Sequence, residues 1–217
     1  MKNNVCPFCE EEKNRTCSLI GKDRTVFETS NFRVFPTVGG FVENYQLIVP
    51  KRHINCFGEL AIEEWQEVKR IIEWERDINR KYFNCDSSIF EHGALLPSNE
   101  SGKSIIHAHL HIFPSKYSLI NNIRDYGFQI QEIIDITKLV EICHQYESYL
   151  YYSDVDGKDY IITHQGLPSQ FLRKVLADSL GIVNWNWREY PCLEDMEKNL
   201  KFYKENPDVY KNFEGGK

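Results

Sequence analysis

The stretch KSIIHAHLHIFP, residues 103–114, places histidines at every second position: His107, His109 and His111. The chain of 217 residues contains only seven histidines in all. A β-strand sends alternate side chains to opposite faces, so these imidazoles are expected on one face of a strand, with small and aliphatic residues on the other. The apolar face suits a core. Because three aligned imidazoles make a poor core, the pattern indicates a functional site.

Two kinds of site suit this histidine run. In one, the imidazoles chelate a metal directly, but such strand sites usually add an aspartate, and here Ile112 and Phe113 follow. In the other, one imidazole is a nucleophile, which neutral histidine can be near pH 7. The segment Gly102-Lys103-Ser104 offers backbone N–H groups and a hydroxyl that suit a phosphate. The second interpretation is favoured.

The first half of the chain reads as strands around one long helix. Runs rich in β-branched and aromatic residues predict strands at 25–28, 32–36, 45–50 and 87–93, before the histidine strand. Apolar residues recur at helical spacing over 57–82, which predicts an amphipathic helix. This combination predicts an α+β domain built on an antiparallel sheet.

The second half changes in character but is not separated by a Ser/Gly-rich linker. Its predicted elements are helices at 136–146, 168–181 and 193–206, and a hairpin at 149–163 around Asp156-Gly157. We therefore divide the chain into a catalytic domain, residues 1–117, and an extension packed on it, residues 118–217.

Composition limits the classes of partner. The net charge of −6 and the pI near 5.7 disfavour non-specific nucleic-acid binding, which needs a basic surface. No apolar run approaches the roughly 20 residues of a membrane span, and the N-terminus lacks the apolar stretch of a signal peptide. The seven cysteines are scattered and odd in number, which argues against a disulfide framework. We expect a soluble, cytoplasmic protein without a membrane or nucleic-acid partner.

The run from His107 to Phe113 resembles the His-φ-His-φ-His-φ-φ signature, with φ apolar, of the histidine triad (HIT) superfamily of nucleotide hydrolases and transferases. Further landmarks match in order: Phe27-Glu28, Phe35-Pro36, Leu47 to His53, and Gly102-Lys103-Ser104. The resemblance covers roughly residues 5–116. It implies an α+β fold with a five-stranded antiparallel sheet and a long helix, and pairing of two copies in a homodimer.

The resemblance also implies roles for single residues. His109, the middle histidine, would attack the α-phosphate of a nucleotide. Ser104 would donate a hydrogen bond to a phosphate oxygen, together with Gly102 and Lys103 in the same loop. His111 would assist around the phosphate and the leaving group.

Three positions depart from the family pattern. Lys103 stands where the family usually has Gln, and Thr37 where an Asp often grips the ribose hydroxyls. His92 replaces an Asn that helps to bind phosphate in the related galactose-1-phosphate uridylyltransferases. These departures leave nucleoside recognition open, while the phosphate chemistry is unaffected, and His92 remains a candidate for substrate binding.

The pair in Cys6-Pro7-Phe8-Cys9 has two interpretations. A glutaredoxin-like redox pair follows a strand and opens a helix, and here only five residues precede Cys6. A structural zinc site needs four tetrahedral ligands. Several members of the resembled superfamily complete such a site with two histidines that match His53 and His107. The resemblance therefore implies one structural zinc bound by Cys6, Cys9, His53 and His107.

The stretch THQGLPSQFLRKVL, residues 163–176, also has two interpretations. Its polar and basic side chains at a helix start, Gln170, Arg173 and Lys174, could hold a phosphate. The alternative, which we prefer, is that they form a solvated helix face. The nearby Trp185-Asn186-Trp187-Arg188 is read as packing.

Together these observations predict a zinc-containing HIT-type enzyme. It would cleave a nucleotide phosphoanhydride or phosphoramidate through a nucleotidyl-His109 intermediate. Two alternatives stay open. One is a nucleotidyltransferase or dinucleoside polyphosphate phosphorylase of the same superfamily, and the other is a non-catalytic nucleotide-binding zinc module.

Overall fold

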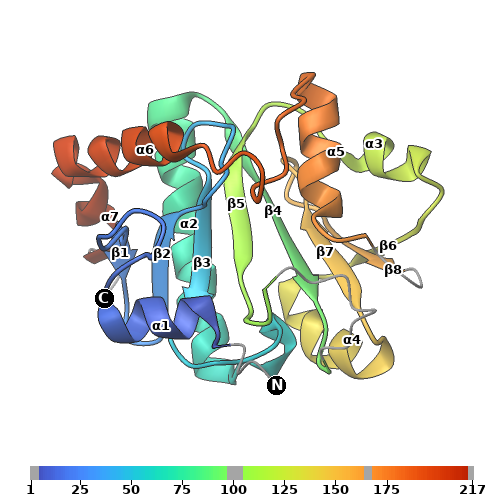
Figure 1. Ribbon diagram of the computed structural model, residues 1–217. Coiled ribbons are helices and arrows are strands. Elements are labelled where there is room, and N and C mark those ends of the chain that lie inside the picture. Colours follow the sequence, from blue (N-terminus) through green and yellow to red (C-terminus); the bar gives the residue numbers. More distant parts are fainter. Residues whose placement is uncertain (1–4, 97–104, 164–167, 215–217) are drawn as a thin grey trace.

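The computed structural model describes residues 5–96, 105–163 and 168–214 (Figure 1). Its elements in chain order are α1 (Pro7–Asn14), β1 (Phe27–Glu28), β2 (Phe32–Pro36), β3 (Gln46–Pro50), the 3-10 turn η1 (Phe57–Glu59), α2 (Ile62–Phe83), β4 (Asp86–Gly93), β5 (Leu110–Ser115), α3 (Ile120–Asp125), β6 (Gln129–Ile133), η2 (Ile136–Lys138), α4 (Leu139–Gln145), β7 (Tyr149–Ser153), β8 (Asp159–Thr163), α5 (Phe171–Leu180), α6 (Leu193–Glu205), η3 (Pro207–Tyr210) and α7 (Lys211–Glu214).

The strands form one antiparallel sheet with the order β1-β2-β3-β5-β4-β7-β8-β6. The predicted α+β class is confirmed, but the predicted strand count of five is wrong, because the sheet has eight strands. The three additional strands come from the second half of the chain, and β7 pairs with β4 from Ile89 opposite Ser153 to Gly93 opposite Tyr149. The two halves therefore share one continuous sheet.

Strand β7 lies inside the sheet because its sequence, YLYYS, is apolar on both faces. All five of its residues are buried. The hairpin from β7 to β8 was predicted and is confirmed, and it turns at Gly157, whose φ of +81° is in the left-handed region that glycine tolerates best. The free edges of the sheet are β1 and β6.

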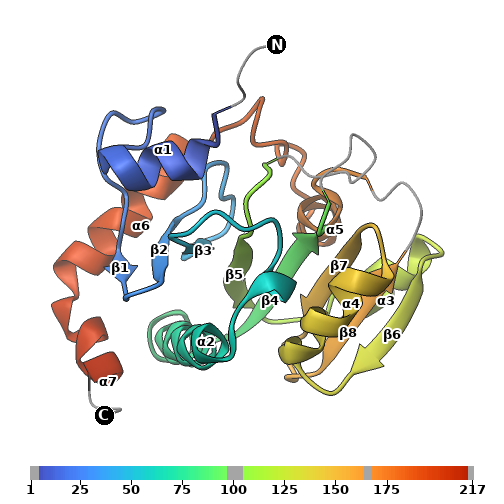
Figure 2. The same cartoon turned by 90° about the horizontal axis from the view of Figure 1, so that it is seen from below.

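Helix α2 covers one face of the sheet, and α1 and α5 lie on the other (Figure 2). The predicted helix at 57–82 is confirmed in its main part, but it begins at Ile62, after a separate turn at 57–59. Val68 and Ile71 are fully buried and pack in one core cluster with Leu110 and Ile112 of β5. Burial of each such side chain contributes about 1.5–3 kcal/mol.

The histidine run is only partly a strand. Strand β5 begins at Leu110, so His107 and His109 precede it. The backbone N–H of Ala108 donates a hydrogen bond of 2.8 Å to the carbonyl of Ile54. This bond attaches the start of the run to the segment that carries His53.

Several short elements were not predicted from the sequence, namely α1, α3, β6 and α7.

The division of the chain at residue 117 stays a prediction. Among the described residues, no helix has both the length and the apolarity that a membrane crossing requires.

A buried polar cluster connects α2 to α6. Glu75 of α2 is fully buried, and its carboxyl lies 3.1 Å from the hydroxyl of Tyr203 and 3.3 Å from the amide of Asn44. Burial raises the pKa of Glu75 to about 8, although the hydrogen bonds of Tyr203 and Asn44 act in the opposite direction. The carboxyl is therefore protonated in the folded protein at neutral pH.

This shift predicts a pH dependence of stability. The pKa of Glu75 in the unfolded chain is about 4.3, so between that value and about 8 the folded state binds more protons than the unfolded state. Stability then falls as pH rises through this window, by up to about 1.4 kcal/mol per pH unit. Glu75→Gln should remove this contribution and gain stability relative to wild type from pH 5 to pH 9.

Urea unfolding at pH 5, 7 and 9 measures the effect. The exposed Glu73 on the same helix supplies the control variant Glu73→Gln. If the unfolding free energies of Glu75→Gln and wild type change in parallel with pH, the raised pKa of Glu75 is contradicted.

Candidate functional site

Four side chains from three separate segments meet beside the start of the histidine run. Cys6 directly precedes α1, and Cys9 lies in the first turn of this helix. His53 comes from the loop after β3, and His107 comes from the loop before β5. One ligand atom from each residue lies within 4.8 Å of the others. This group could hold a metal ion.

The ring of His107 is oriented for metal binding. Its Nε2 lies 2.9 Å from the carbonyl oxygen of Pro50, and because a carbonyl can only accept, Nε2 carries the proton. The other nitrogen, Nδ1, is then unprotonated and lies 3.3 Å from the sulfur of Cys6. A carbonyl partner that fixes the tautomer is the usual support of a metal-ligating histidine.

The thiol of Cys9 makes metal binding sensitive to pH. Burial, with a smaller contribution from the adjacent Cys6, raises the pKa of Cys9 to about 11. A metal needs the thiolate, so an ion that binds here displaces the proton and binds less tightly in acid.

His109 is fixed by the backbone of its neighbour. Its Nδ1 donates a hydrogen bond of 2.7 Å to the carbonyl oxygen of His107. In the neutral ring the lone pair is then on Nε2, a nitrogen that can act as a nucleophile. The side chain lines a large cavity, so the arrangement suits attack on a bound molecule.

His111 is held by aromatic neighbours. Its Nδ1 lies 3.0 Å from the hydroxyl of Tyr45, and its ring stacks on Phe90 at a centroid distance of 4.3 Å. Burial lowers the pKa of His111 well below its usual value, and the nearby guanidinium of Arg173 acts in the same direction. His111 is therefore neutral at physiological pH.

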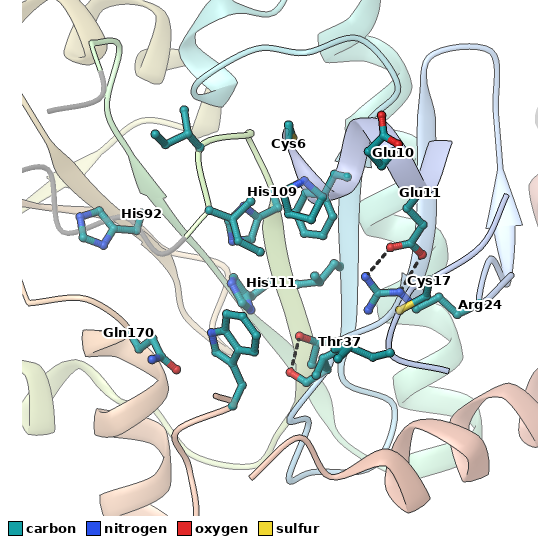
Figure 3. Close-up of a pocket in the computed structure, with 18 of the residues that line it drawn as sticks. Cys6, Glu10, Glu11, Cys17, Arg24, Thr37, His92, His109, His111 and Gln170 are labelled. Atoms are coloured by element: carbon teal, nitrogen blue, oxygen red, sulfur yellow. Dashed lines mark hydrogen bonds and ion pairs between the residues drawn. The ribbon is translucent and has the colours of Figure 1, made fainter. Parts of the chain in front are cut away.

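The cavity has a volume of about 1120 Å³ and collects residues from both halves of the chain. His109, His111 and His92 of β4 border it together with Gln170 beside α5 (Figure 3). This size suits a nucleotide-like molecule. The predicted phosphate-binding residues Gly102, Lys103 and Ser104 lie outside the described residues.

Helix α1 closes one side of the cavity. Phe8 packs edge-on against the rings of His107 and His109, at centroid distances of 5.6 and 5.5 Å. Glu11 accepts two hydrogen bonds, of 2.8 and 2.9 Å, from the guanidinium of Arg24 (Figure 3). Both partners of this ion pair are nearly fully buried, so it anchors the helix that carries both cysteines.

Sequence reasoning missed the supporting residues. Phe8 was read only as a spacer between two cysteines, and Tyr45 only as part of a strand. Arg173 was assigned to a solvated helix face, which is wrong, because its side chain is buried and lines the cavity. Thr37 also lines the cavity, although its hydroxyl donates to the carbonyl of Val38.

No protein-family model and no curated protein matches this chain. Solved structures do match it. A hypothetical histidine triad nucleotide-binding protein of Sulfolobus tokodaii is 18% identical, with a TM-score of 0.40 over 51% of this chain and 69% of that protein. A HIT family member of Bacillus subtilis is 21% identical, with a TM-score of 0.43 over 52% of this chain and 74% of its own.

A Hit-like protein of Bartonella henselae, described as involved in cell-cycle regulation, is 17% identical, with a TM-score of 0.42 over 66% of this chain and 94% of its own. Because all three TM-scores are below 0.5, we derive the chemistry from this chain's own residues.

The buried ion pair of α1 yields a prediction. Glu11→Ala leaves the buried guanidinium of Arg24 without its carboxylate, which typically costs roughly 3–5 kcal/mol. We expect that loss of unfolding free energy in urea, together with weaker metal retention, because α1 carries Cys6 and Cys9. Glu10→Ala, on the exposed side of the same helix, is the matched control. Equal stability of the two variants would contradict the role of Glu11 as an anchor.

Proposed function

We propose that this protein is a nucleotide hydrolase that cleaves a phosphoanhydride or phosphoramidate through a nucleotidyl-histidine intermediate. The observation that carries the proposal is the hydrogen bond from Nδ1 of His109 to the carbonyl of His107, at 2.7 Å. In the neutral ring this bond leaves the lone pair on Nε2, and the side chain lines a nucleotide-sized cavity.

The first chemical step is an attack by Nε2 of His109 on the α-phosphorus. A P–N bond forms, the bond to the leaving group breaks, and the leaving group departs with the electron pair. The ring becomes positively charged, and its Nδ1–H continues to donate to the carbonyl of His107. This carbonyl therefore stabilises the intermediate without moving.

In the second step water attacks the same phosphorus and the P–N bond breaks. Neutral His111, hydrogen-bonded to Tyr45, accepts the proton that the water loses. A nucleoside monophosphate leaves and His109 is regenerated. In this proposal Ser104, with Gly102, Lys103 and His92, binds the phosphate oxygens.

We propose that the metal of the Cys6, Cys9, His53 and His107 cluster is zinc in a structural role. Tetrahedral zinc places sulfur and nitrogen ligand atoms about 3.5 Å apart. The distances from Nδ1 of His107 to the sulfurs of Cys6 and Cys9, at 3.3 and 3.6 Å, are close to this value. A four-residue site has no open position for substrate, so zinc would fix geometry here. A homodimer and a cytoplasmic location remain expectations.

The catalytic prediction concerns His109. His109→Ala should keep its fold and metal but lose at least about a thousandfold in rate, because the covalent route is removed. The assay is release of nucleoside monophosphate from a panel of nucleoside phosphoramidates, dinucleoside polyphosphates and nucleotide sugars. His144→Ala, which changes an exposed histidine of α4, is the control. Activity of His109→Ala within tenfold of wild type would exclude His109 as the nucleophile.

Adding inorganic phosphate or a sugar phosphate to the same assay separates hydrolysis from transfer. We expect water to remain the main acceptor. If products containing the added acceptor dominate at millimolar concentration, the protein is a transferase.

The metal prediction is one zinc per chain. Protein purified without added zinc should contain about one equivalent, and the double variant Cys6→Ala with Cys9→Ala should contain none and unfold at lower temperature. Cys85→Ala, which removes a thiol outside the cluster, is the control. Elemental analysis that finds full zinc in the double variant would overturn the ligand assignment.

A further inference from the structure

Arg173 is the buried residue that the proposed chemistry leaves without a use. It lies in the first turn of α5, and its side chain is 97% buried. It nevertheless lines the cavity that contains His109 and His111. Its neighbour Lys174 points elsewhere and forms an exposed ion pair with Asp178.

The guanidinium of Arg173 has neutral partners only. Its Nη2 donates to the carbonyls of Gly39 and Trp185, and the group lies over the rings of Phe41 and Tyr45 at 5.2 and 5.4 Å. Among the described residues no carboxylate pairs with it, and its Nε and Nη1 have no hydrogen-bond partner. A buried charge is costly unless it is paired and hydrogen-bonded.

The position of this charge connects it to the reaction. Arg173 stacks on the ring of Tyr45, whose hydroxyl lies 3.0 Å from Nδ1 of His111. Gln170, one turn earlier, borders the same part of the cavity from the α5 side, opposite α1 (Figure 3). The unpaired cation is thus linked to His111 through Tyr45 and lines the same cavity as His109.

We propose that Arg173 binds a second phosphate group, so that the substrate is a nucleoside diphosphate or another pyrophosphate-linked nucleotide rather than a phosphoramidate. The inference rests on the proposed function. The guanidinium suits a phosphate because a hydrogen bond between two charged groups is short and strong. The second phosphate supplies an acceptor to Nη1 or to Nε, which both lack one. When Nε2 of His109 forms its bond to the α-phosphorus, the bridging oxygen takes the electron pair and leaves on this phosphate.

Two other roles of Arg173 make different predictions. If it only joins the carbonyls of Gly39 and Trp185, its removal affects all substrates and the stability alike. If it binds the α-phosphate, it again affects both substrate classes equally. Only a contact to the second phosphate makes the loss depend on the leaving group.

The experiment compares kcat/KM for two substrates of one nucleoside, the 5′-diphosphate and the 5′-phosphoramidate, in wild type, Arg173→Met, Arg173→Lys and Lys174→Met. Arg173→Met should lower the diphosphate value about 10- to 100-fold more than the phosphoramidate value. Arg173→Lys should retain part of the preference, and the control Lys174→Met should retain all of it. Equal losses on both substrates overturn the proposal.

An equilibrium measurement separates this proposal from the proposed function and needs no stable variant. Wild-type protein is titrated with nucleoside monophosphate, nucleoside diphosphate and pyrophosphate by calorimetry. Tighter binding of the diphosphate than of the monophosphate, lost in Arg173→Met where that variant folds, supports the second-phosphate site even if no substrate is cleaved. Equal affinity of wild type for mono- and diphosphate overturns it, even if the phosphoramidate is hydrolysed.

Discussion

His107 serves two neighbouring groups at once, and the rest of the site depends on this arrangement. Its imidazole points to Cys6 and Cys9, with Nε2 fixed by the carbonyl of Pro50. Its own carbonyl fixes the tautomer of His109. A cluster that immobilises residue 107 therefore also orients the ring of His109, the nucleophile that we propose. Under our proposal, a structural metal thus acts on the rate through the backbone and not through contact with substrate.

The shared sheet explains why the two halves of the chain act together. Since β7 pairs with β4, the second half is held in register with the strand that carries His92. This pairing brings α5, with Gln170 and Arg173, to the cavity opposite α1. One half of the molecule supplies the imidazoles, and the other supplies a buried cation. The specificity that we infer is therefore a property of the whole chain.

Sequence reasoning succeeded where a local pattern carries the signal. The helical spacing over 57–82 gave α2, and the alternation around His109 separated an apolar face from an imidazole face. It failed where burial or pairing is decided by distant residues. Strand β7 has no local feature that reveals β4 as its partner, so the predicted hairpin was not placed in the sheet, which was expected to have five strands and has eight. Arg173 was predicted to be solvated, but its guanidinium is buried and donates to the carbonyl of Gly39 instead of to water. Because Gly39 is far away in the chain, no local pattern reveals this contact. Helix α1 was missed because it is short and is stabilised by the Glu11–Arg24 pair rather than by its own apolar pattern.

The stereochemical course at phosphorus tests the covalent histidine intermediate most directly. One in-line displacement inverts the configuration, whereas two in succession restore it. A nucleotide with a chiral α-phosphorothioate, hydrolysed in water enriched in oxygen-18, gives a product whose configuration reports the number of displacements. Our account predicts net retention. Net inversion would show that water attacks the substrate directly and would contradict a nucleotidyl-His109 intermediate.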